Sequence, residues 1–381
     1  MAMICPRSVT GDGRRHMCAD VQSPVLVLNS GSSSLKYGLY FVDRDQCRTL
    51  FAGSEESVRD LPSAIARIAQ VLAAAGLPEP AAIGHRIVHG GRALRKHVAI
   101  DAAVMRQLDA AKAFAPLHVP QALELVRAAQ DRFPLIPHIA CLDTAFHFGM
   151  PDVARTLPIA REFRDAGVER YGFHGLSCES IVRQLGETLP RRLIIAHLGH
   201  GASVTAVANG RSIDTSMGLT PTGGVIMSTR CGDIDPGIVA YLIREHGYDA
   251  VQVEQLIDGR SGMLGVSGIS DDMRVLRAAA ASGDATSANA QLAIDMFCYS
   301  VRKQIGAMAM ALDGVDLLVF TGGIGEHDAA TRLSISDGLG ALGLRQQRGA
   351  VCVLPSQEGE QIARHSWRIA GDRQTTPTVG T

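Results

Sequence analysis

The chain has 381 residues, of which 46% are hydrophobic and 4% aromatic, and its 37 Lys and Arg residues nearly balance its 38 Asp and Glu residues. A chain of this length exceeds one ordinary core, so two domains are expected. The balanced charge provides no electrostatic attraction to nucleic acid or to a membrane surface, and so few aromatic rings give no surface for stacking bases. We therefore expect neither nucleic acid nor a membrane as a partner.

The cysteines and the N-terminal segment bear on the compartment. The eight cysteines are scattered without a CxxC pair, which is typical of reduced thiols rather than of a disulfide framework or a zinc site. No apolar run approaches the roughly 20 residues that a membrane helix needs. Residues 1–24 are polar and lack the apolar centre of a secretory signal. We interpret them as a flexible N-terminal extension, and we expect the protein to be cytoplasmic.

The first half of the chain alternates strand and helix patterns. Two apolar runs, 25–29 and 35–42, flank a turn of small residues, which predicts a hairpin. Apolar residues at helical spacing and alternating or continuous apolar runs mark the elements that follow. Helices are predicted at 63–75, 104–113 and 121–131, and strands at 81–88 and 135–142.

The pattern restarts in the second half. Residues 193–198 and 204–208 are apolar runs around a Gly-rich turn, so they repeat the strand, turn and strand of the opening hairpin. Two such units half a chain apart indicate a duplicated architecture. The remaining predictions are helices at 237–245, 272–281 and 288–312 and a strand at 317–320. We expect two α/β domains that face each other across a cleft.

The first motif that carries chemistry is Asn29-Ser-Gly-Ser-Ser-Ser-Leu-Lys36. Small residues let backbone amides approach a phosphate, while hydroxyls and a lysine add donors and positive charge. The order GxxxxGK[ST] of a P-loop is absent. A polar hairpin turn is the alternative interpretation, but the flanking strands and the terminal lysine favour a phosphate site.

Two further Gly-rich turns follow predicted strands. One is Gly199-His-Gly-Ala-Ser203, preceded by His197, and the other is Thr321-Gly-Gly-Ile-Gly-Glu326. Ligands of α/β proteins bind at the carboxyl ends of strands. A single turn of this kind is weak evidence, whereas three of them indicate one nucleotide held by several backbone loops.

Charged side chains next to glycines or at strand ends form the last group. A lone arginine or histidine is more often a surface or core residue, but packing does not require one at these positions. An arginine can bond two oxygens of a carboxylate or phosphate at once, and an aspartate after a strand suits magnesium. The residues concerned are Arg86, His89, Asp143, His147, His174, Arg230, Asp233 and Asp235.

Taken in order, these motifs resemble the acetate kinase family. The resemblance spans residues 25–364 and is most specific over 214–236. It implies the superfold of sugar kinases, Hsp70 and actin, an α/β fold with two related βββαβαβα-type domains around a central cleft, and a homodimer. We expect domain I at 25–146, with 358–381 returning to it, and domain II at 147–357, which would bind nucleotide and dimerise.

The resemblance implies reversible, direct in-line phosphoryl transfer between ATP and acetate, giving ADP and acetyl phosphate, with Mg²⁺ or Mn²⁺ as cofactor. The implied catalytic residues are Asp143, His174 and Arg230. Arg86 would bind the acetate carboxylate, beside a methyl pocket of Val88, Leu117, Phe173 and Pro221. Asn29 and Glu358 would hold the metal. The implied ATP contacts are Ser32, Ser34, Lys36, His197, Leu198, Gly199, His200, Gly201, Asp272, Met273, Arg274, Gly323, Ile324, Gly325, Glu326 and His327.

The sequence departs from the family pattern in the phosphate loops and near the metal ligand. His200 and His327 replace smaller or amide residues, and Gly359 leaves open whether Glu358 or Glu360 is the acidic ligand. A propionate kinase is the nearest alternative, because one methylene is worth only about 1–3 kcal/mol in a pocket. A non-enzymatic ATP-binding module is a second alternative, which the presence of Arg86 disfavours.

Overall fold

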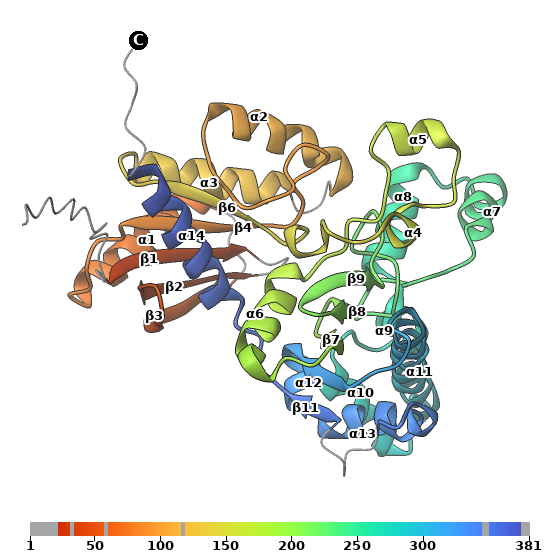
Figure 1. Cartoon of the computed structure of the whole chain (residues 1–381). Coiled ribbons are helices and arrows are strands. Elements are labelled where there is room, and N and C mark those ends of the chain that lie inside the picture. The colour runs from red at the N-terminus through yellow and green to blue at the C-terminus, as the bar shows by residue number, and fades with distance from the viewer. Residues whose placement is uncertain (1–21, 31–33, 57–59, 116–118, 345–349, 375–381) are drawn as a thin grey trace, which may run out of the picture.

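The structure is a computed structural model of the whole chain, and it describes residues 22–30, 34–56, 60–115, 119–344 and 350–374 (Figure 1). Two predicted site residues, Ser32 and Leu117, lie outside these ranges, as do residues 1–21 of the predicted extension.

The first sheet has the strand order β3-β2-β1-β4-β6-β5. The first three strands form an antiparallel meander, and β4 and β6 add in parallel beside β1. Alternate residues of β1 pack on opposite faces: Leu26 and Leu28 contact the side of α1 and α3, whereas Val25 and Val27 contact α14. The bounds are β1 Ser23–Ser30, β2 Ser34–Val42, β3 Cys47–Glu56, β4 Ala82–Ile87, β5 Val98–Ala99, β6 His138–Leu142, α1 Leu61–Ala74, α3 Val119–Arg132 and α14 Glu358–Gln374.

The second sheet has the order β11-β10-β7-β8-β9. Its largest core lies against the long helix α11, where Phe297 and Val301 meet Ile194 of β7, and its other face packs on Ile181 of α6. The bounds are β7 Arg192–Leu198, β8 Ala202–Ala208, β9 Arg211–Thr215, β10 Leu317–Thr321, β11 Val351–Val353, α6 Gly175–Leu185 and α11 Ser287–Ala311.

The two sheets repeat one topology. From β3 to β6, the neighbouring strands of the first sheet form two antiparallel pairs and then two parallel pairs. The strands of the second sheet follow the same order from β9 to β11. The expected fold class, two related actin-like α/β domains, is therefore confirmed. Strands β3 and β9 were absent from the prediction because β3 is only partly buried, with a mixed pattern, and β9 has five residues.

The remaining helices are short and lie mostly around the second sheet (Figure 1). Residues 322–327, expected as a turn, form the helix α12. No helix in the described part of the chain is long and apolar enough to span a membrane. The bounds are α2 Ala102–Ala110, α4 Asp152–Arg155, α5 Arg161–Asp165, α7 Gly237–His246, α8 Ala250–Gly259, α9 Gly262–Ser267, α10 Met273–Ser282, α12 Gly322–His327 and α13 Ala329–Asp337, with 3-10 turns at Ala111–Phe114, Ala145–His147, Gly186–Thr188 and Gly340–Leu342.

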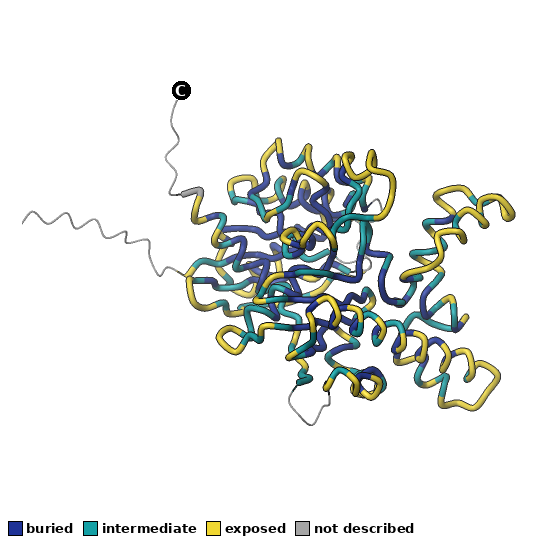
Figure 2. The backbone as a smooth tube through the Cα atoms, turned by 45° about the vertical axis from the view of Figure 1, so that its right-hand side comes forward, coloured by how far each residue is buried: buried dark blue, intermediate teal, exposed yellow. Residues whose placement is uncertain are grey.

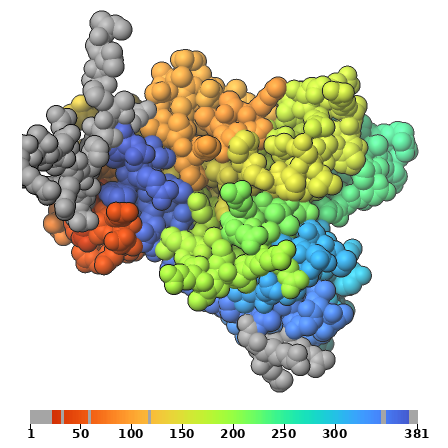
Figure 3. All heavy atoms as spheres, in the orientation of Figure 1, coloured from red at the N-terminus to blue at the C-terminus, as the bar shows by residue number. Residues whose placement is uncertain are grey.

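Helices α6 and α14 connect the two halves. After β11 the chain returns to the first sheet, where α14 packs on β1, β2, β4 and β6. Figure 3 shows this dark blue segment set between the red and orange N-terminal parts. Helix α6 contacts α14 and β6 on one side and β7 on the other. Figure 2 shows buried backbone running through both sheets, with exposed residues on the outer helices.

Candidate active site

A cavity of about 920 Å³ lies between the two sheets, bordered by strand ends of both. This is the size and position expected of a small-molecule site in an α/β protein. The sequence-predicted residues that line it are Asn29, Lys36, Arg86, Val88, Asp143, Phe173, His174, His197, Gly199, His200, Gly201, Pro221, Arg230, Gly323, Glu326, His327 and Glu358.

Other predicted ATP contacts are not among the described residues that line this cavity. Leu198 is fully buried in the core of the second sheet. The carboxylate of Asp272 caps α10, and its Oδ2 atom lies 2.6 Å from Nη2 of Arg274. The predicted residues outside the cavity wall are Ser34, Leu198, Asp272, Met273, Arg274, Ile324 and Gly325.

An ion pair between Arg86 and Asp143 forms part of the cavity wall. These residues lie at the carboxyl ends of the neighbouring parallel strands β4 and β6. Nε and Nη2 of Arg86 donate to Oδ2 of Asp143 at 2.8 and 2.5 Å, and the aspartate side chain is only 1% exposed. The sequence identified both residues but assigned them separate roles, so their direct pairing is a new observation.

A set of oxygen ligands surrounds this pair. Nη1 of Arg86 donates to Oδ1 of Asn29 at 3.4 Å, and Nδ2 of Asn29 donates to Oε2 of Glu358 at 3.2 Å. Oδ1 of Asp143 is buried and has no hydrogen bond of normal geometry to any described residue. Two carboxylates and an amide oxygen lie together here, and the Oδ1 atom of Asp143 still lacks such a hydrogen-bond partner among the described residues. This set of oxygen atoms suits a hard divalent cation such as Mg²⁺. Glu360 instead pairs with Arg183 and Arg364, which favours Glu358 as the acidic ligand.

The electrostatics of the two carboxylates also fit a cation. Burial raises the pKa of Asp143, and the nearby Glu358 carboxylate adds to this effect, whereas Arg86 opposes it. Burial acts in the same direction on Glu358, but Arg86, His197 and Asn29 hold the pKa of Glu358 below its usual value. Because two buried negative charges share one guanidinium, a divalent cation would allow both to remain ionised.

Helix α6 begins directly beside Asp143. Its Gly175 amide donates to the carbonyl oxygen of Asp143 at 2.8 Å, and a Cβ atom on Gly175 would lie 2.2 Å from that oxygen, so a glycine is required there. His174 precedes the helix in a left-handed conformation, with φ of 58°. A non-glycine residue in this conformation is strained, and such strain is concentrated at functional sites.

The imidazole of His174 is held as a neutral hydrogen-bonding group. Its Nδ1 atom lies 2.9 Å from the hydroxyl of Ser203, and its ring stacks on His197 with centroids 4.2 Å apart. Burial, followed by the nearby His197, Arg86 and Arg230, lowers the pKa of His174 well below its usual value. The ring is therefore neutral at pH 7.

Gly201 lies between His174 and Arg230. A Cβ atom at this position would lie 3.2 Å from both Nε2 of His174 and Nη1 of Arg230. The absence of a side chain brings the phosphate-loop backbone close to both donors. An anion in this part of the cavity would meet a guanidinium, an imidazole and backbone amides together.

Comparison with known proteins decides the family. The sequence profile described as the acetokinase family matches residues 52–362. The chain belongs to the acetokinase family. It is 41% identical to acetate kinase 2 of Neisseria meningitidis serogroup B, over 91% of this chain and 98% of that protein. It is 38% identical to an acetate kinase of Rhodopseudomonas palustris, with the same coverage.

Two solved structures agree with this assignment. A propionate kinase from Francisella tularensis superimposes with a TM-score of 0.82 at 33% identity, covering 91% of this chain and 100% of that one. The acetate kinase of Porphyromonas gingivalis superimposes with a TM-score of 0.81 at 33% identity, covering 91% and 99%. The family resemblance read from the motifs is therefore confirmed.

The cavity wall also contains residues that the sequence did not reveal. Oε1 of Glu326, predicted to contact ATP, accepts hydrogen bonds from the amides of Gly322 and Ser356 at 2.9 and 2.8 Å, so it joins α12 to the segment before α14. The Ser177 hydroxyl lies 2.8 Å from Nδ1 of His197. The lining residues without a prediction are Val27, Ser30, Tyr37, Gly38, Tyr40, Ala52, Gly53, Ser54, Gly322, Ser356 and Gly359. Ser30 and Gly322 belong to two of the predicted loops, although neither was assigned a role, and most of the others lie in strands β1, β2 and β3 without a distinctive local motif.

His200, the main departure from the acetokinase pattern, lines the cavity with its side chain 52% exposed. Its Nδ1 atom lies 3.8 Å from Oδ2 of Asp271. Burial and the Arg230 charge lower the pKa of His200, while Asp271 acts in the opposite direction. The imidazole is therefore mainly neutral at pH 7 in the absence of nucleotide.

Proposed function

We propose that the protein is an acetate kinase that transfers a phosphoryl group reversibly between ATP and acetate. The observation that carries the proposal is the position of Arg86 in the cavity wall, together with buried Val88, Phe173 and Pro221 and with His174 and Arg230. An arginine next to a small apolar wall suits a short carboxylate. The names of the family relatives support the same substrate.

Arg86 would hold the acetate carboxylate in the proposed reaction. Arg86 donates three hydrogen bonds, two to Asp143 and one to Asn29. Because a guanidinium has five N–H groups, donors remain for a substrate. Acetate is ionised at neutral pH because carboxyl groups titrate near ~4. It therefore needs orientation and charge neutralisation rather than a general base.

The phosphoryl group would be transferred in line and without a phosphoenzyme. His174 and Arg230 would donate hydrogen bonds to its oxygens as negative charge develops. Asn29, Asp143 and Glu358 would hold Mg²⁺, or Mn²⁺ in its place, which neutralises charge on the phosphates. Asp143 would orient the metal's water or the nucleophile rather than accept a proton. Trapping a phosphorylated Asp or Glu by rapid quench would contradict direct transfer.

The decisive experiment is acyl-phosphate formation, trapped with hydroxylamine, from acetate, propionate and butyrate at matched concentrations. We expect the highest kcat/KM with acetate. A higher value with propionate would favour the alternative, which the name of the Francisella tularensis structure supports. Nucleotide binding without any acyl phosphate would indicate a non-enzymatic ATP-binding module, although such a module would not need Arg86.

We also propose a homodimer formed through the second domain, at 147–357. Helix α7 has no buried residue in the single chain, and Ile238, Tyr241 and Ile243 on it are 42–49% exposed. Such a helix needs a partner surface to bury its apolar side. Light scattering during gel filtration tests this, and a monomeric mass would contradict it.

We place the reaction in the cytoplasm, with which the six described free cysteines agree.

A further inference from the structure

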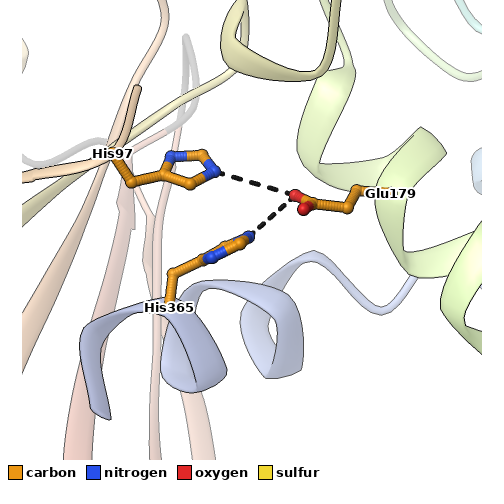
Figure 4. Close-up of side chains that lie close together, drawn as sticks. All are labelled: His97, Glu179 and His365. Atoms are coloured by element: carbon orange, nitrogen blue, oxygen red, sulfur yellow. Dashed lines mark hydrogen bonds and ion pairs between the residues drawn. The ribbon is translucent and has the colours of Figure 1, made fainter. Parts of the chain in front are cut away.

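Outside the cavity, three side chains converge between β6, α6 and α14 (Figure 4). His97 precedes β5, Glu179 lies on α6 and His365 lies on α14, and one nitrogen or oxygen atom of each lies within 4.8 Å of the others. Their side chains are 12%, 30% and 8% exposed. We call these residues the His–Glu–His cluster. Two histidines and a carboxylate in this arrangement raise the question of a bound metal.

The hydrogen bond to His97 argues against a metal. The backbone N–H of Leu142 donates to Nδ1 of His97 at 3.0 Å, so Nδ1 carries no proton. In the neutral ring the proton is then on Nε2, which faces Oε2 of Glu179 at 3.7 Å. A histidine that binds a metal through Nε2 keeps its proton on Nδ1 and donates it to an acceptor. The Leu142 amide excludes that form, and His97 becomes a donor toward Glu179.

The second histidine directs an N–H group toward the same carboxylate. Nε2 of His365 lies 2.7 Å from the same Oε2 atom of Glu179, a distance at which an unprotonated nitrogen would repel the carboxylate. Although burial acts to raise it, the hydrogen bond from His365 and the nearby His97 hold the pKa of Glu179 well below its usual value. One carboxylate oxygen therefore accepts a hydrogen bond from His365 and faces Nε2 of His97 at the longer distance of 3.7 Å.

The surrounding groups leave Glu179 as the acceptor of the cluster. Nε2 of Gln361 on α14 lies 3.1 Å from Nε2 of His365, but both nitrogens are donors when His365 donates to the carboxylate, so this contact adds no hydrogen bond in that state. The other charged or titratable groups that act on the cluster are Arg183 of α6, Arg368 of α14 and the buried thiol of Cys141 in β6. Burial lowers the pKa of His97, which agrees with a neutral ring that donates from Nε2.

Each member of the cluster is attached to an element that carries a proposed site residue. The donor on β6, the Leu142 amide, is next to the proposed catalytic aspartate in the sequence. The carboxylate lies on the helix that begins after the strained histidine, and the second histidine lies about two turns after the acidic metal ligand on α14. His97 is thus connected through Leu142 to Asp143. Glu179 shares α6 with the preceding His174, and His365 shares α14 with Glu358.

We propose that the His–Glu–His cluster positions the phosphoryl-transfer site by clamping β6, α6 and α14 together. The three residues are positioning residues, because none of them lines the cavity. The proposal rests on the proposed kinase function. Positioning of this kind matters because a displacement of about 1 Å can slow a reaction about 100-fold.

The test replaces Glu179 by glutamine, which preserves its size and removes its charge. In the hydroxylamine assay we expect Glu179→Gln to lower kcat by about 10-fold to 100-fold, while KM for acetate and ATP changes by less than about twofold. His365→Gln should have a similar effect, and the double variant should be no worse than either, because both break one unit. Glu187→Gln, in the exposed turn after α6, is the matched control and should keep the wild-type kcat.

A second readout does not depend on kinase activity. Trp367 is the only tryptophan of the chain, lies on α14 two residues after His365, and packs partly buried against the core between α14 and the first sheet. Loosening of α14 in Glu179→Gln should shift its fluorescence emission to longer wavelength, whereas Glu187→Gln should not. If the wild type formed no acyl phosphate, the proposed function would fail, and this emission shift would still decide on the clamp.

Three results would overturn the positioning role. Unchanged kcat and emission in Glu179→Gln, with only a lower melting temperature, would show a purely structural ion pair. Independent, multiplicative losses in the double variant would show that Glu179 and His365 do not act as a unit. If the purified wild type contained one zinc ion per chain and Glu179→Gln contained none, the cluster would be a metal site instead.

Discussion

Arg86 and Asp143 form a two-point ion pair in which Nε and Nη2 of the arginine both reach a single carboxylate oxygen, Oδ2. The other oxygen, Oδ1, is buried without a hydrogen bond of normal geometry to the described residues. The pair therefore presents an unsatisfied carboxylate oxygen for a cation and a guanidinium for an anion. One contact between two strand ends thus connects the proposed metal site with the proposed carboxylate site.

Arg86→Leu should raise the KM for acetate by at least about 10-fold and also lower kcat, since one arginine both binds and orients the nucleophile. It also leaves Asp143 buried without its partner, so a stability loss of about 3–5 kcal/mol is expected. Steady-state kinetics and urea denaturation measure the two effects. An unchanged KM for acetate in a folded variant would contradict the assignment. In Arg86→Ala, added guanidine should restore part of the rate.

Asp143→Asn should lower kcat by at least about 100-fold, as expected when a charged group that organises the transition state is removed. The side chain keeps its size but loses the charge that supports the metal and holds Arg86. The alternative is that Asp143 only caps the start of α6, whose Leu176 amide interacts weakly with its carboxylate. Asparagine caps about as well as aspartate. Near-normal turnover would therefore support the capping role.

The sequence predicted the strands that carry the site better than the contacts between them. Arg86 and Asp143 were identified at the ends of predicted strands, but their pairing depends on β4 and β6 being neighbours, which no local pattern specifies. Helix α6 was not predicted, because both sheets bury parts of it and its buried residues include Ser177 and Ser180. Its apolar periodicity is therefore weak.

The His–Glu–His cluster had no sequence signal at all. Its three members come from a loop, an unpredicted helix and the C-terminal helix, and only the tertiary structure brings them together. In contrast, the Gly-rich turn at Gly199 was found, since a turn that follows a strand is encoded within a few residues. The Gly-rich segment at Gly323 was also located, although it forms the helix α12 and not a turn.

The stability of the protein should fall as the pH is lowered from 6.5 toward 4. His147 is fully buried, with Nδ1 2.9 Å from the Ser212 hydroxyl and Nε2 2.9 Å from the Phe173 carbonyl, and burial lowers its pKa to about 4. The unfolded chain binds a proton near 6.5 that the folded protein excludes, so protons favour unfolding in this range. The contribution is roughly 3 kcal/mol at the acid end.

Urea denaturation at a series of pH values checks this expectation. His147→Gln should have a smaller slope of unfolding free energy against pH than the wild type, even where it is less stable overall. The exposed His246 provides the control, because His246→Gln should leave the slope unchanged. Equal slopes for His147→Gln and the wild type would contradict the assignment of a neutral, buried His147.

The affinity for ATP should depend on the protonation of His200. In the absence of nucleotide, burial and Arg230 lower the pKa of His200. The phosphates of ATP in the neighbouring loop would favour the charged imidazole and raise this pKa on binding. Binding that takes up a proton is strengthened by protons, so ATP should bind more tightly as the pH falls through the range between the two pKa values.

His200→Asn provides the test, since asparagine is a residue that the family resemblance leads us to expect there. Titration of ATP at a series of pH values should give a flatter affinity profile for His200→Asn than for the wild type. The phosphates of ATP titrate in the same range, but their contribution is common to both proteins and cancels in the comparison. The side chain is half exposed and near Asp271, so it could instead face solvent in the complex. Identical pH profiles for the two proteins would establish that orientation and exclude a contact between His200 and the phosphates.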